Sequence, residues 1–227
     1  SLNSGAAWKV TEVGAIPVPW YSHRIVTRIM ARSLTPGWAM NTGEKLIELW
    51  TRESLDGWER ESPIPEEEVA LYLLAAEATK QDARRHHEES GVFRSPAFEG
   101  VVKDLSGLSA EALMAEFRDR FGETNDRGAK AVLGRLELGP LRWYRRVMKL
   151  APLRFRPNGQ RSVVKEWASC ERRGFAPHLS APEREILVAY RDASGVNWIA
   201  AGYHRADSLF RRGEREVRTY FAVPIEP

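Results

Sequence analysis

The charges of this chain are separated along the sequence rather than mixed, and this separation limits the folds that it can adopt. Residues 127–173 carry thirteen Lys and Arg against three acids, a local excess of +10. The preceding residues 53–126 carry eighteen acids against eight bases, a local excess of −10, and the whole chain has a net charge of only +3. We expect a fold that presents one electropositive face beside an acidic segment.

The middle of the basic segment interleaves guanidinium groups with aromatic rings, in LRWYRR at residues 141–146. Guanidinium groups bind phosphates and flat rings stack on bases, so this composition indicates a nucleic-acid surface. The predicted binding residues are Arg32, Arg142, Trp143, Tyr144, Arg145, Arg146, Lys149, Arg154, Arg156, Arg161 and Lys165. We expect residues 141–151 to be helical, with the cations on one broad face. The alternative is a solvated face packed against the acidic helices of residues 66–126.

Composition excludes several classes of protein. The single cysteine, Cys170, allows no disulfide within the chain and no cysteine-based zinc site. His86 and His87 are adjacent and would point in different directions on a helix, so we expect no metal site. No P-loop, dinucleotide fingerprint or HExxH stretch is present, and we expect no cofactor. No run of eighteen apolar residues and no secretory leader occurs, which favours a cytoplasmic protein without a membrane partner.

The pattern of apolar residues and turn signals predicts an α+β fold. Strands are predicted at residues 8–16, 45–54, 58–61, 186–191, 196–203 and 216–225. Helices are predicted after Ser22 and from Glu66, Ser109, Asp126, Leu141 and Ser162. We therefore predict a sheet domain built from both chain ends, residues 1–62 and 180–227, interrupted by a helical insertion with a basic surface, residues 63–179.

The residues His23, Arg24, Arg28 and His204 are the candidate catalytic residues. His23, Arg24 and Arg28 belong to the predicted helix after Ser22, and His204 is followed by Arg205. A neutral imidazole can take the proton of an RNA 2′-hydroxyl while neighbouring cations stabilise the charged phosphorane, which permits cleavage without a metal. The alternative is that each histidine is an ordinary surface or core residue.

The predicted order strand, helix, strand, strand at the start, the hairpin and strand at the end, and the basic first helix resemble the ferredoxin-like RAMP proteins of CRISPR systems. The resemblance is architectural and covers residues 8–61 and 184–225. It implies an RNA-binding protein: some members of that superfamily cut the repeat RNA without a metal, and others remain bound as effector-complex subunits. Of the family's catalytic chemistry, only its use of His or Arg from the first helix maps onto this chain, at His23, Arg24 and Arg28.

The leading hypothesis is an RNA-binding protein, which as a metal-independent endoribonuclease would process a structured RNA and stay bound to it as to a guide RNA. A second hypothesis is a double-stranded DNA-binding regulator or plasmid-maintenance protein that uses the helices between Ser109 and Gly174. A third is a non-catalytic subunit of a nucleoprotein complex, whose acidic residues 53–126 would dock on a basic protein partner.

Overall fold

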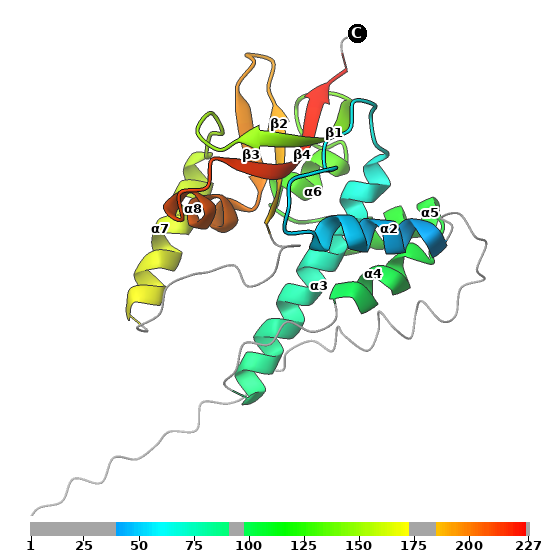
Figure 1. Cartoon of the computed structure of the whole chain (residues 1–227), viewed down its shortest axis with the longest axis horizontal. Coiled ribbons are helices and arrows are strands. Elements are labelled where there is room, and N and C mark those ends of the chain that lie inside the picture. The colour runs from blue at the N-terminus through cyan, green and yellow to red at the C-terminus, as the bar shows by residue number, and fades with distance from the viewer. Residues whose placement is uncertain (1–39, 91–97, 173–184, 226–227) are drawn as a thin grey trace, which may run out of the picture. The chain divides into compact units, whose positions relative to one another are not determined.

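The structure, a computed structural model shown in Figure 1, describes residues 40–90, 98–172 and 185–225. In chain order its elements are α2 (Met40–Thr51), α3 (Glu66–Ser90), α4 (Phe98–Ser106), α5 (Ala110–Phe121), α6 (Arg127–Val132), β1 (Leu141–Lys149), α7 (Pro157–Arg172), β2 (Ile186–Arg191), β3 (Asn197–Ala201), α8 (Tyr203–Arg211) and β4 (Glu216–Pro224). Helices and one mixed sheet confirm the predicted α+β class. The ferredoxin-like arrangement stays a prediction, and the strand and helix predicted before residue 33 lie outside the described residues.

The four strands lie in the order β1-β4-β2-β3. β4 pairs antiparallel with β1 along the whole strand, from Leu141 opposite Pro224 to Lys149 opposite Glu216. On its other side β4 pairs parallel with β2, and β2 forms the predicted antiparallel hairpin with β3. The predicted strands at 186–191 and 216–225 are thus confirmed. β1, however, arises inside the segment predicted as a helical insertion, so that segment also contributes an edge strand to the sheet.

The prediction of a helix over residues 141–151 is wrong, because these residues form β1. Aromatic and β-branched side chains favour a strand here, and all nine residues find partners on β4. The partner strand lies some seventy residues further along the chain, so no local pattern could reveal the pairing. This strand also interrupts the helical unit from Ser109 to Gly174 that the DNA-binding hypothesis requires.

The prediction of a strand over residues 45–54 is also wrong, because most of this stretch belongs to helix α2. Leu46, Ile47 and Trp50 are buried, at the spacing of one helix face. Gly43 precedes them and lies against Ser106 of α4, where an added Cβ would stand 2.2 Å from the Ser106 Oγ. The apolar residues of LIELW therefore form the buried face of an amphipathic helix, and Glu48 within the run is exposed.

Residues 58–61, predicted as a strand, form no strand of the sheet but lie along the outer edge of β1. The backbone N–H groups of Arg60 and Ile64 donate to the carbonyl oxygens of Arg145 and Trp143, at 3.1 and 2.9 Å. The side chain of Glu59 accepts from the N–H of Val147 at 3.2 Å. These contacts satisfy part of an edge that would otherwise be open to a further strand.

The predicted helix starts at Glu66, Ser109 and Asp126 are confirmed. Ser109 and Asp126 cap α5 and α6, accepting hydrogen bonds from the N–H groups of Ala112 and Ala129. α6 ends at Val132, and α7 begins at Pro157 rather than at Ser162. The helices α4 and α8 were not predicted.

The two faces of the sheet pack against different partners. One face carries Trp143, Arg218 and Tyr220, which lie against α2, α3 and the segment 58–64. The other face packs against α8 and the loop that follows β1, through the cluster of Leu150, Leu153, Leu187, Ala189, Ile199, Ala206, Leu209, Val217 and Phe221. α7 lies beside α8, in agreement with Figure 1. Of the helices that the structure describes, none has the length and apolar character needed to cross a membrane.

Candidate nucleic-acid interface

The alternation of β1 divides the predicted binding residues between the two faces of the sheet. Successive side chains of a strand point to opposite faces. Arg142, Tyr144 and Arg146 therefore share one face, and Trp143 and Arg145 share the other. Arg142 is exposed and Tyr144 and Arg146 are partly exposed, whereas Trp143 is buried with 2% of its surface accessible. The helix prediction had placed Arg142, Arg145 and Arg146 together, and that grouping is wrong.

The exposed side chains form what we call the basic strip: Arg142, Tyr144 and Arg146 of β1 with Arg191 of β2. The guanidinium of Arg146 lies 5.1 Å from the centroid of the Tyr144 ring. The guanidinium of Arg191 lies 5.5 Å from the ring of Phe221, which stands on β4 between these strands. The basic strip thus places three cations and the Tyr144 ring on one sheet face, whereas the Phe221 ring beside Arg191 is buried in the core.

The cations of the basic strip are not neutralised by neighbouring acids. Within residues 40–90, 98–172 and 185–225, no carboxylate forms an ion pair with Arg142, Arg146 or Arg191. Among the described residues, Arg191 donates to the side-chain oxygen of Asn197, at 3.0 Å. Since an exposed cation without a carboxylate partner keeps its full attraction for anions, the strip is suited to phosphate groups.

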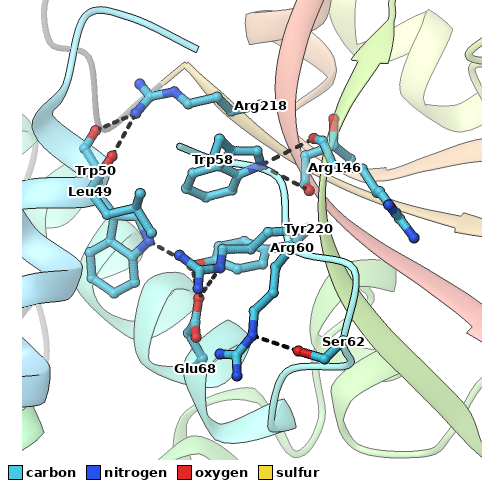
Figure 2. A network of polar contacts seen from close by, with 11 residues as sticks. Leu49, Trp50, Trp58, Arg60, Ser62, Glu68, Arg146, Arg218 and Tyr220 are labelled. Carbon is cyan, nitrogen blue, oxygen red and sulfur yellow. Dashed lines mark hydrogen bonds and ion pairs between the residues drawn. The ribbon is translucent and has the colours of Figure 1, made fainter. Parts of the chain in front are cut away.

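The opposite face of β1 takes part in a buried polar network, shown in Figure 2. The indole N–H of Trp50 donates to the Tyr220 hydroxyl at 2.6 Å, and that hydroxyl donates to Glu68 Oε1 at 2.9 Å. The Nε of Arg145 lies 3.5 Å from the same carboxylate oxygen, at ion-pair distance but without hydrogen-bond geometry. Arg145 therefore compensates a buried carboxylate, and it is removed from the predicted binding surface.

Burial controls the ionisation of this network. Burial raises the pKa of Glu68 above its usual value, and the Arg145 guanidinium and the Tyr220 hydroxyl oppose that rise. Burial raises the pKa of Tyr220 well above its usual range, and the neighbouring Glu68 adds to the rise. Arg218 completes the contact between sheet and helices by donating to the backbone carbonyls of Leu49 and Trp50. The network ties α2 and α3 to the centre of the sheet.

Trp143 is likewise removed from the binding surface, because it belongs to the core. Its indole N–H has no hydrogen-bond partner within the described residues. In Figure 2 the side chain of Arg146, by contrast, points away from the buried network. Tyr144 is therefore the ring of β1 that can meet a base.

The remaining predicted cations lie in three places. Lys149 is exposed at the end of β1, opposite Glu216. Arg161 and Lys165 are exposed and one helical turn apart on α7. Arg154 is exposed and Arg156 is partly buried in the short extended piece before α7, whose backbone pairs with β3 at the far edge of the sheet. These cations belong to the same sheet and its flanking helix, but they do not form one continuous cluster with the strip.

Of the candidate catalytic residues, the structure describes His204. It is exposed in the first turn of α8, and its Nε2 lies 3.2 Å from the Ser162 Oγ of α7. His23, Arg24 and Arg28, together with the predicted binding residue Arg32, lie outside the described residues. The catalytic roles predicted for His23, Arg24 and Arg28 therefore stay predictions.

Two further features bear on ligand binding. A cavity of about 670 Å³ at the end of α5 is lined by Arg118, Asp119, Arg120, Gly122, Glu123, Thr124 and Arg135, none of which was a predicted site residue. Within the part of the chain that the structure describes, no three His, Cys, Asp or Glu side chains gather where they could hold a metal ion. Neither feature adds to the basic strip.

The sequence interpretation missed Arg191 as a member of the strip. The alternation Leu187, Ala189, Arg191 in a predicted strand was the available signal for one shared face. This alternation could not indicate the strand order, because β4, from the end of the chain, lies between β1 and β2.

Comparisons of the chain with protein-family models, with curated proteins and with solved structures found no match.

Proposed function

We propose that this protein binds RNA through the basic strip. The single observation that carries the proposal is the set of three arginines, Arg142, Arg146 and Arg191, that have no carboxylate partner within the described residues and share one sheet face with the partly exposed ring of Tyr144. A partly exposed tyrosine ring on a sheet face suits unstacked bases, which single-stranded loops and ends of RNA expose. The strip cations would contact the phosphates on either side of such a base.

The proposal extends to a structured RNA that stays bound, as a guide RNA does, which is what the resemblance to RAMP proteins implies. Nothing in the comparisons supports that resemblance, and the strip supports the RNA proposal independently of it. Duplex DNA offers phosphates to the same cations but keeps its bases stacked, so Tyr144 would contribute less to its binding.

The test is a titration of a fluorescein-labelled single-stranded RNA, followed by fluorescence anisotropy at several salt concentrations. The double variant Arg142→Glu with Arg146→Glu should bind roughly tenfold or more weakly, because two phosphate contacts become repulsive. Its salt slope should fall by about 1.4, or about 0.7 for each lost contact. A hairpin RNA and a DNA duplex of matched length measure the preference for unpaired bases.

The matched control is Lys45→Glu with Lys103→Glu, which reverses two exposed charges on α2 and α4 and changes the net charge equally. The control should keep most of the affinity and the wild-type salt slope. If both double variants bind alike, the attraction comes from net charge alone and the strip is not the binding surface.

Metal-independent RNA cleavage is a second candidate, favoured by the hydrogen bond between His204 and Ser162. An exposed imidazole can accept a 2′-hydroxyl proton, and Arg161 precedes Ser162 on the same helix. The test is incubation of RNA with the protein in EDTA, followed by analysis of the product ends. A 2′,3′-cyclic phosphate formed by wild type and lost in His204→Ala is the expected result. Intact RNA, or equal cleavage by the variant, would remove the catalytic hypothesis and leave the binding proposal standing.

A further inference from the structure

In the loop before α7, Arg156 lies over the ring of Trp198 on the edge strand β3, and we call this pair the Arg156–Trp198 stack. The guanidinium carbon of Arg156 lies 4.1 Å from the centroid of the Trp198 ring on β3. The Nε and one terminal nitrogen of the same guanidinium donate to the Tyr190 hydroxyl, at 3.1 and 2.7 Å. A guanidinium fixed by two hydrogen bonds and a ring cannot rotate freely, so its plane is held in one orientation.

The charge of Arg156 has no counter-ion in the described residues. Its hydrogen-bond acceptor, Tyr190, is a neutral phenol, and none of the ion pairs involves Arg156. Arg156 is partly buried, and removing a cation from water without a paired anion costs free energy. Arg154, two residues earlier, is exposed and adds a second cation, which has no carboxylate partner in the part of the chain that the structure describes.

A hydrogen bond to Asp192 holds the Trp198 ring of the stack in position. The indole N–H of Trp198 donates to Asp192 Oδ2 at 2.6 Å, and Asp192 Oδ1 accepts from Ser194 and from the N–H of Val196. The hydrogen bonds from Ser194 and Trp198 lower the pKa of Asp192 to about 2, so the carboxylate stays ionised near neutral pH. Asp192 thus orients the indole and does not pair with Arg156.

The backbone of the loop is fixed as well. The N–H of Arg154 donates to the carbonyl of Asn197 at 2.9 Å, and the N–H of Ile199 donates to the carbonyl of Arg154 at 3.0 Å. Arg154 is therefore attached to β3 through two backbone bonds, and Arg156 follows it two residues later. A site whose side chains and backbone are ordered before binding loses little conformational entropy when a ligand arrives.

We propose that the Arg156–Trp198 stack binds one unpaired nucleotide, with the base on the guanidinium face turned away from Trp198 and the phosphate against Arg154. Bases of RNA stack on arginine planes as well as on aromatic rings. β3 and β1 are opposite edges of the sheet, about 14 Å apart at three strand spacings. The ligand class rests on the proposed RNA-binding function, but the stack is a separate contact from the basic strip.

The experiment uses the full chain labelled with ¹⁵N, titrated with uridine 5′-monophosphate while the indole N–H resonance of Trp198 is followed. Trp198→Phe assigns that resonance. We expect a saturable shift with the nucleotide and none with inorganic phosphate at equal concentration. Arg156→Lys keeps the charge but loses the plane, and it should weaken nucleotide binding about fivefold or more. Arg154→Ala should weaken binding of the nucleotide more than binding of uridine.

The strip variant Arg142→Glu with Arg146→Glu distinguishes nucleotide binding at the stack from RNA binding at the basic strip. It should leave the uridine monophosphate titration unchanged while reducing the affinity for long RNA. No shift with the nucleotide, an equal shift with inorganic phosphate, or an Arg156→Lys titration identical to wild type would overturn the stack proposal. A nucleotide that titrates Trp198 in a protein with no affinity for RNA would overturn the proposed function and leave the nucleotide site standing.

Discussion

The two faces of β1 use the same kinds of residue for opposite purposes. On one face Trp143 and Arg145 are part of the core, where Arg145 lies beside the buried carboxylate of Glu68. On the other face Tyr144 and Arg146 are partly exposed, and the Arg146 cation has no carboxylate partner within the described residues. The four residues are consecutive in the sequence. The comparison shows that a basic and aromatic composition does not by itself identify binding residues. Successive side chains of a strand point to opposite faces, and here Trp143 and Arg145 point into the core.

The largest expected difference separates the two neighbouring rings. Trp143→Ala should destabilise the fold by about 3–5 kcal/mol, because it removes a buried indole and leaves a cavity. Tyr144→Ala should cost less than about 1 kcal/mol of stability but weaken binding of single-stranded RNA by about 1–3 kcal/mol, the usual value of one stacked base. Urea denaturation and RNA anisotropy measure the two effects. Equal losses of stability in the two variants would contradict the division between the faces.

The next difference is one of stability and distinguishes Arg145, which has a buried carboxylate partner, from Arg146 on the opposite face. Glu68→Ala should destabilise the fold by about 3 kcal/mol, because Arg145 keeps a largely buried charge without a counter-ion. The side chain of Arg145 is 14% exposed, which allows some hydration and places the effect at the lower end of the usual range. Arg146→Ala is the control on the strip face and should change stability by less than about 0.5 kcal/mol. Chemical denaturation of both variants at neutral pH decides the comparison.

The smallest expected effect is a pH dependence confined to the buried face. Because the pKa of Glu68 is raised in the folded state, the folded protein holds a proton that the unfolded chain has already released. Stability should therefore fall as pH rises from about 4.5 towards the raised pKa, and should level off above it. Glu68→Gln should lack this component. If the free energies of unfolding of wild type and Glu68→Gln differ by the same amount at every pH between 4 and 8, Glu68 does not titrate in that window.

Local signals in the sequence predicted those elements whose stabilisation is local. The carboxylates at the start of α3, and the caps Ser109 and Asp126, mark helix ends through contacts with neighbouring residues. The β2–β3 hairpin is predicted by its four-residue turn, with Gly195 at a φ of +81°. The errors fall where the deciding contact is distant: α2 is a helix packed against α4 and the sheet, and β1 is a strand paired with β4.

The sequence by itself determined the α+β class, the segregation of charge and most of the cations from which a nucleic-acid surface could be made. Only the tertiary structure decided which of them face outward, since a change from helix to strand regroups every side chain of residues 141–149. Arg191 joined the strip, and Trp198 came to lie under Arg156, through the strand order β1-β4-β2-β3. Strand order depends on hydrogen bonds between segments far apart in the chain, and these leave no periodic signal in the sequence.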